Sequence, residues 1–74
     1  MKSIHLTALV EKEDDGFVSL CPELDVASQG DSVEEATANL KEAVELFLES
    51  APPEEVARRY RPEVFISRFE AEYA

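Results

Sequence analysis

The sequence predicts an α+β domain with the order β-β-β-α-β, in which one helix covers one face of an antiparallel-rich sheet. Three observations predict it. Residues 2–12 and 63–73 alternate between two rows of side chains, the period of a strand. Residues 33–49 carry apolar side chains at intervals of three and four, the period of a helix. A chain of 74 residues has room for one core, so residues 1–74 are expected to be one domain.

The first two strands are expected to form a hairpin. The first strand covers residues 2–12, and Asp15-Gly16 marks the turn because glycine adopts positive φ without strain. The second strand covers residues 17–21 and ends at Pro22, which has no N–H to donate. The rows predicted to face the core are Ile4, Leu6, Ala8 and Val10 in the first strand, and Val18 and Leu20 in the second.

The helix carries the strongest local signal. Residues 22–25 form a connector and residues 26–29 a short third strand, which ends at Gly30 in a sharp corner. Ser32 and Glu35 then make a capping box, in which the hydroxyl accepts from the amide three residues on. The helix is expected to end before the two prolines at 52 and 53. Its predicted core row is Val33, Ala36, Leu40, Val44 and Phe47.

The last third of the chain is expected to hold a connector and a fourth strand. Residues 53–57 suit one helical turn, with proline at its start and acids behind it. Arg58, Arg59 and Arg61 follow, and salt bridges to the acids of the helix are favoured for them over a phosphate site. The alternation of residues 63–73 predicts the fourth strand.

Charge and cysteine content exclude several classes of protein. Seventeen acidic and seven basic residues give a net charge of −10, which repels phosphate backbones and disfavours direct binding of nucleic acid. The single cysteine, Cys21, cannot form an internal disulfide. The first residues contain no apolar run long enough for a signal peptide or a membrane span. We therefore expect a cytoplasmic protein without a membrane partner.

The residues needed for catalysis are sparse. His5 is the only histidine, so a histidine pair for zinc is excluded, and Cys21 has acidic sequence neighbours that disfavour its thiolate. Neither glycine belongs to a phosphate-binding loop. We expect no catalytic residue, no cofactor and no metal. A metal-dependent nuclease built from the many carboxylates remains the weakest alternative.

Several motifs in order resemble the HicB family of antitoxins. They are the run Asp15-Gly16-Phe17 into the second strand, the connector Pro22-Glu23-Leu24, and the segment Gln29-Gly30-Asp31-Ser32 followed by Val33-Glu34-Glu35-Ala36. Residues 41–49 continue the match, which is sharpest over 15–49. The resemblance implies a partial ribonuclease-H-like fold and the neutralisation of HicA, a small basic toxin that cuts messenger RNA. The DNA-binding module that many HicB proteins carry is not expected in the 25 residues after the helix.

The resemblance leaves an alternative of a different class. The chain could be an orphan homo-oligomeric domain that binds another protein or a small ligand. A neighbouring gene for a short basic protein would favour the antitoxin, and its absence would favour the orphan domain.

Two surfaces are predicted to bind partners. One helix covers only one face of the sheet, so apolar side chains on the other face predict a homodimer or a higher homo-oligomer. Its interface residues are predicted to be Phe17, Val64, Phe65, Ile66 and Phe69. A basic partner such as a HicA-like toxin is predicted to meet an acidic rim made of Glu11, Glu13, Asp14 and Asp15.

Overall fold

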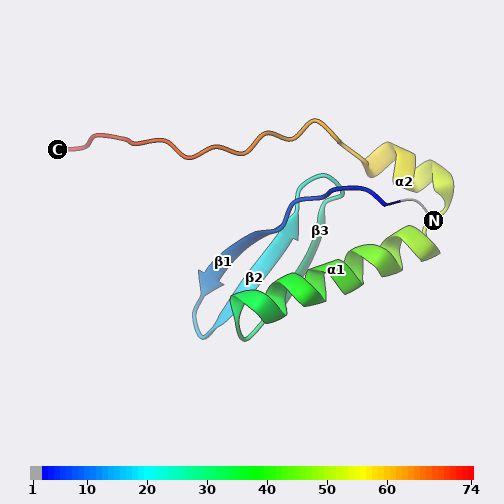
Figure 1. Ribbon diagram of the computed structural model, residues 1–74, viewed down its shortest axis with the longest axis horizontal. Helices are drawn as coiled ribbons and strands as arrows, with labels where there is room; N and C mark the ends of the chain where they lie inside the picture. The colour runs from blue at the N-terminus through cyan, green and yellow to red at the C-terminus, as the bar shows by residue number, and fades with distance from the viewer. Residues whose placement is uncertain (1–2) are drawn as a thin grey trace.

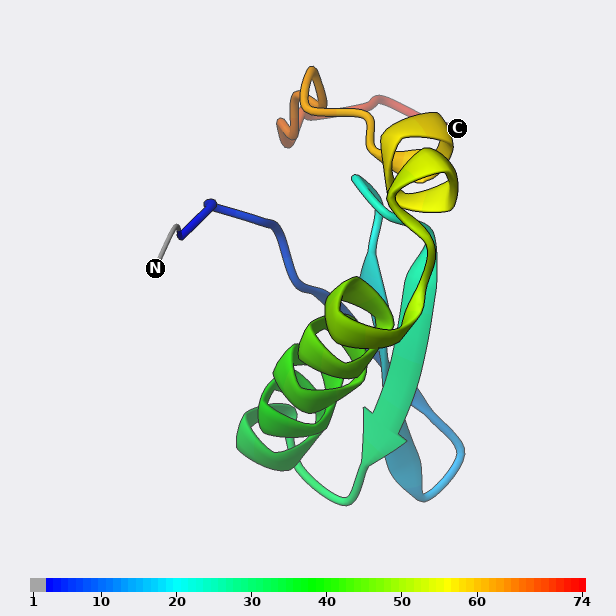
Figure 2. The ribbon, with the colours of Figure 1, turned by 90° about the vertical axis from the view of Figure 1, so that its right-hand side faces the viewer.

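The computed structural model describes residues 3–74 and has the predicted α+β architecture. Strands β1 (Leu9–Glu13), β2 (Gly16–Cys21) and β3 (Val26–Gly30) form an antiparallel sheet in the order β1-β2-β3. Helix α1 (Val33–Ser50) packs on one face, and helix α2 (Pro53–Arg59) lies at the end of the sheet where β2 turns into β3 (Figure 1). Figure 2 shows α1 and the sheet as two layers. The predicted β-β-β-α order is confirmed.

Strand β1 is shorter than predicted. Leu9 pairs with Leu20, so residues 3–8 run past the end of β2, where Pro22 cannot continue the ladder. These residues have no strand partner in the described chain. Lys2, the predicted first residue of the strand, lies outside the described residues.

The hairpin turn is made by aspartates. Glu13 pairs with Gly16, which leaves Asp14-Asp15 as a two-residue loop. Asp14 adopts φ 52°, a conformation that aspartate tolerates better than most residues, whereas neither glycine has positive φ. The conformational role predicted for Gly16 therefore belongs to Asp14.

The face of β2 that meets the helix is opposite to the predicted one. Ser19 and Cys21 are buried, at 2% and 1% exposure, whereas Leu20 on the other face is 36% exposed. The Ser19 hydroxyl donates to the Ala36 carbonyl at 2.9 Å. Small side chains on β2 let the helix backbone approach, and this contact outweighs the burial of Leu20.

The core lies between the sheet, the β2–β3 turn and α1. Its buried apolar side chains are Cys21, Leu24, Ala36, Leu40 and Val44, with Leu6, Val26, Phe47, Leu48 and Tyr60 packed at the margin. The helix row was predicted correctly except for Val33, which is exposed at its first turn. In the first strand's row, Ile4 and Ala8 are also exposed, because they precede the paired part of β1.

The helix caps follow the prediction. The Ser32 hydroxyl accepts from the Glu35 amide at 3.0 Å, and the Glu35 carboxylate accepts from the Asp31 amide at 2.6 Å. Gly30 is required by contact with the helix: a Cβ there would lie 2.5 Å from the Ala36 nitrogen. The predicted turn at 53–57 is confirmed as part of α2.

The predicted fourth strand is not part of the sheet. Residues 61–74, here called the C-terminal arm, are extended and have no strand partner in the described chain. In Figure 1 the arm runs away from the body to the far C-terminus. A strand needs a neighbouring edge for its backbone hydrogen bonds, and this arm does not meet one among residues 3–74.

Candidate protein-binding surface

The acidic rim lies at one end of the sheet. Its four residues, Glu11, Glu13, Asp14 and Asp15, are all exposed on β1 and on the hairpin turn. The turn from β3 into α1 lies at the same end of the molecule (Figures 1 and 2). Between them is a hollow of about 490 Å³, whose lining includes Glu13, Asp14, Asp15, Asp31 and Glu35. The structure thus adds two acids of the helix corner to the predicted rim.

The predicted interface residues lie on two different elements. Val64, Phe65, Ile66 and Phe69 belong to the arm, where Phe65 and Phe69 are 89% and 88% exposed. Phe17 lies on β2 and shares the helix-facing row with Ser19, and the Lys12 ammonium stands 5.0 Å from its ring centre. The open face of the sheet presents Leu9 and Leu20 instead, so the predicted location of Phe17 on that face is wrong.

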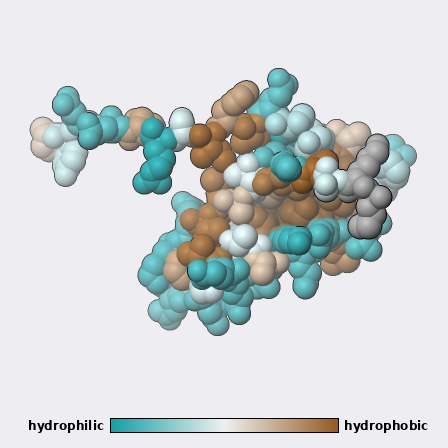
Figure 3. Space-filling model, in the orientation of Figure 1, coloured by the Kyte–Doolittle hydropathy of each residue, from teal (hydrophilic) through white to brown (hydrophobic). Residues whose placement is uncertain are grey.

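An apolar groove lies between α1 and the residues that precede β1. It has a volume of about 900 Å³. Figure 3 shows hydrophobic side chains gathered in this region, between the start of the chain and α1. The lining residues are mainly apolar and include Ile4, Leu6, Ala8, Leu40, Val44 and Leu48, with Lys41, Glu45 and Glu49 at the helix.

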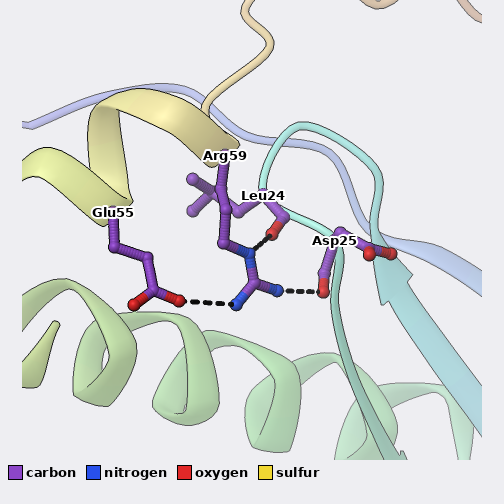
Figure 4. A network of polar contacts seen from close by, with 4 residues as sticks. All are labelled: Leu24, Asp25, Glu55 and Arg59. Carbon is purple, nitrogen blue, oxygen red and sulfur yellow. Dashed lines mark hydrogen bonds and ion pairs between the residues drawn. The ribbon is translucent and has the colours of Figure 1, made fainter.

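The two arginines in the last turn of α2 have separate roles. Arg59 donates through Nε to the Leu24 carbonyl at 3.1 Å and through Nη2 to the Asp25 carbonyl at 2.6 Å (Figure 4). Its third nitrogen lies 3.8 Å from the Glu55 carboxylate, within α2. The guanidinium also stacks 4.6 Å from the ring centre of Phe47. Arg59 therefore fastens α2 to the β2–β3 turn, whereas Arg58 is exposed.

One carboxylate is buried in the fold. Glu23 accepts from the Thr7 amide at 3.0 Å and from the Thr7 hydroxyl at 2.5 Å, and the Cys21 thiol lies 3.5 Å from the same carboxylate. Burial raises the pKa of Glu23, but the hydrogen bonds from Thr7 outweigh it and hold the pKa below its ordinary value. Glu23 is therefore a charged structural group whose donors are already in place.

The candidate reactive residues are not assembled into a site. His5 is exposed on the segment before β1. Burial raises the pKa of the Cys21 thiol, and the Glu23 carboxylate raises it further, so the thiolate is disfavoured. Among residues 3–74, no group of three histidine, cysteine or acidic side chains is arranged to hold a metal ion.

Sequence reasoning missed the residues of the β2–β3 turn. Leu24 is completely buried and Glu23 nearly so, although both lie in a segment predicted to be a connector. The sequence Pro-Glu-Leu-Asp contains one leucine between two acids, and this isolated apolar residue is the feature that could have predicted burial of the turn. The apolar groove had no sequence signal, because it forms where residues 3–8 leave the ladder.

Neither helix is long and apolar enough to cross a membrane, as judged over residues 3–74.

Three similar proteins carry the same family name. A UPF0150 protein of Helicobacter pylori is 36% identical over 70 residues, which covers 93% of this chain and 97% of that protein. Two UPF0150 proteins of Synechocystis are 47% and 52% identical over 47 and 48 residues. The chain spans 65% and 61% of the length of these two relatives. No family model matches the chain, and no solved structure matches it either.

Proposed function

The chain belongs to the UPF0150 family of small proteins, and we propose that it acts there as a HicB-like antitoxin. In this proposal it is a protein-binding module that neutralises a small basic toxin, similar to HicA, which cleaves messenger RNA. It has no catalytic activity of its own and does not bind nucleic acid directly. The observation that carries the proposal is the acidic end of the molecule, which consists of the acidic rim together with Asp31 and Glu35 at the start of α1.

Charge supports a basic protein as the partner. The net charge is −10, and five carboxylates line the hollow at the acidic end. Complementary charge speeds the encounter of two proteins and fixes their orientation. A toxin that binds RNA needs a basic surface, and covering that surface with carboxylates blocks the substrate.

The proposal also concerns assembly and compartment. The working unit is a homodimer, which the exposed aromatic side chains of the arm support, because a monomer rarely leaves so large an apolar set in water. The compartment is the cytoplasm, where an unpaired cysteine such as Cys21 stays reduced.

Co-expression with the neighbouring gene tests the proposal. The proposal predicts that a neighbouring gene encodes a short basic protein, that this protein arrests bacterial growth when expressed alone, and that this chain restores growth. The double variant Glu13→Gln, Asp15→Asn should restore it less well, whereas Glu42→Gln, Glu54→Gln should behave like the wild type. Both pairs change the net charge equally, and all four residues are exposed. Equal rescue by both double variants would show that the acidic end does not bind the toxin. No rescue by the wild type would show that the chain is not an antitoxin for this protein.

Incubation with RNA tests the claim that the chain has no activity. The purified protein should leave a labelled messenger RNA intact in the presence of Mg²⁺ or Mn²⁺. Metal-dependent cleavage that follows the protein through purification would favour the nuclease alternative.

A further inference from the structure

The C-terminal arm has the properties of a strand without a sheet. It is extended (Figure 1). Three aromatic side chains on one of its two alternating rows, Phe65, Phe69 and Tyr73, are 89%, 88% and 96% exposed. A long, exposed, apolar strand is an aggregation hazard that natural proteins pair or cover. Pairing of the arm with a sheet edge would remove this hazard.

The root of the arm is fixed to the body. Tyr60 packs against the core, and the Arg61 amide donates to the Glu23 carbonyl at 2.7 Å. Pro62 then favours extended backbone at Arg61, because it disfavours the helical conformation of the preceding residue. From this root the arm leaves the body in Figure 1, and the chain reaches 49 Å along its longest axis.

An open edge lies at β1 (Leu9–Glu13), and residues 3–8, unpaired in the described chain, lead into it. The strand order makes β1 an edge strand, and residues 3–8 extend it in sequence. Residues 3–13 and 63–73 are each eleven positions long, about 36 Å at the rise of a strand. A strand placed beside this edge would direct every second side chain toward α1, where the apolar groove lies.

The two rows of the arm differ in polarity, which determines the face that enters the groove. Phe65, Phe69 and Tyr73 share one row, which carries a charge only at its first residue, Glu63. The other row begins with Val64 and Ile66 but continues with Arg68, Glu70 and Glu72. The aromatic row suits the groove of about 900 Å³, and the charged row suits the open face of the sheet.

We propose that two copies of this chain exchange their arms, and that each arm lies on the β1 edge of the other copy with Phe65 and Phe69 in the apolar groove. The inference rests on the proposed homodimer and specifies which surfaces form its interface. Exchange is reciprocal and closes with two-fold symmetry, so each arm and each β1 edge has a partner. Three aromatic residues from each copy, at roughly 150–250 Å² each, supply the area of a standard stable interface.

Sedimentation equilibrium tests the role of the aromatic row. The wild type should have twice the chain mass of 8.3 kDa, and the double variant Phe65→Asp, Phe69→Asp should have the mass of one chain. The matched control is Arg68→Asp, which changes the net charge by the same amount on the opposite row and should remain dimeric. The aspartates replace exposed side chains, so circular dichroism should show an intact fold. A monomeric wild type would overturn the inference.

Cross-linking between different copies tests where the arm lies. Ser67→Cys is made in one copy and Lys41→Cys in a second, tagged copy, both with Cys21→Ala, and the two are mixed and treated with a short bismaleimide. The expected product joins the two different chains. Glu42→Cys, which lies beside Lys41 but does not line the groove, should cross-link at least tenfold less.

The remaining outcomes separate this inference from the proposed function. A dimer that survives the change of both phenylalanines, or equal cross-linking at residues 41 and 42, would mean that the copies meet elsewhere. A cross-link formed only within one monomeric chain carrying both cysteines would mean that the arm folds back on its own body. Each result overturns arm exchange. Rescue from the basic toxin is measured separately and stands or falls independently.

Discussion

The amide and the hydroxyl of Thr7 both donate to the carboxylate of Glu23, at 3.0 and 2.5 Å. These bonds tie the segment before β1 to the β2–β3 turn, across sixteen positions of sequence. The Glu23 carbonyl accepts from the Arg61 amide, so the same residue also holds the root of the C-terminal arm. Glu23 thus connects the two segments that arm exchange would bring together between copies.

The first prediction concerns the pH dependence of stability. Glu23→Gln should lower the free energy of unfolding by about 1–3 kcal/mol at pH 7, since it removes a charged acceptor from the partly buried donors of Thr7. The pKa of Glu23 is lowered in the fold, so its stabilisation is complete above the unfolded-state pKa of about 4.3 and is lost as the pH falls through the lower folded value. The difference between wild type and variant in urea unfolding should therefore shrink as the solution is acidified.

The control for this prediction is Glu54→Gln, because Glu54 is exposed on α2. Its effect on the free energy of unfolding should be small. A Glu23→Gln difference that stays constant down to about pH 2 would contradict the lowered pKa.

The second prediction concerns the approach of the helix to β3. Gly30→Ala should destabilise the fold by about 1–3 kcal/mol, because the added Cβ would lie 2.5 to 2.9 Å from backbone atoms of Glu35 and Ala36. Gly16→Ala is the matched control, since its Cβ would lie 3.3 Å from the Gly30 carbonyl oxygen. Equal thermal stability of the two variants would show that α1 shifts without cost.

How far the sequence predicts this fold depends on how local each signal is. The Ser32–Glu35 capping box and the row Ala36, Leu40 and Val44 predicted α1 to within one residue, since cap and row lie within a few turns. The face of β2 was predicted wrongly because apolar side chains occur on both sides, and the choice depends on the contact of Ser19 with Ala36. Such a contact between distant elements has no signal in the period of the strand.

For the candidate binding surfaces too, the sequence predicts local features and misses those that depend on contacts between distant segments. The acids of the rim were found from their sequence, because the hairpin tip is local and exposed. The groove forms because residues 3–8 do not pair with β2. The alternating pattern continues through these residues, so it does not indicate where the pairing ends. The alternation of residues 63–73 predicted a fourth strand, but the structure shows these residues without a strand partner in the described chain. A strand needs an edge to pair with, and the period of two does not specify one.

The third prediction concerns the core row of α1. Leu40→Ala should lower the free energy of unfolding by roughly 2–5 kcal/mol, because Leu40 is 3% exposed and its removal leaves a cavity. Leu46→Ala makes the same chemical change at a side chain that is 62% exposed and should cost no more than about 0.5 kcal/mol. Urea unfolding of both variants measures the contrast, and a similar midpoint for the two would contradict the assigned helix face.

The fourth prediction concerns the reactivity of Cys21. Burial and the Glu23 carboxylate both raise its pKa, so a thiol reagent at pH 7 should modify it far more slowly than an unfolded peptide cysteine. Addition of urea above the unfolding midpoint should bring the rate to that of the peptide. Rapid modification of the folded protein would show that the turn carrying Glu23 opens readily.

The last prediction concerns the attachment of α2. Arg59→Lys keeps the charge but cannot donate to the Leu24 and Asp25 carbonyls with the same planar geometry, and the Leu24 carbonyl belongs to a fully buried residue. The variant should lose about 1–3 kcal/mol of stability. Hydrogen exchange should show faster exchange at the amides of Tyr60 and Arg61, which bond to Val56 and Glu23, while the amides of α1 stay protected. Arg58→Lys, at an exposed position of the same helix, should leave exchange unchanged. If the amides of Tyr60 and Arg61 exchange equally slowly in both variants, Tyr60 packing alone holds α2, and Arg59 does not fix the root of the arm.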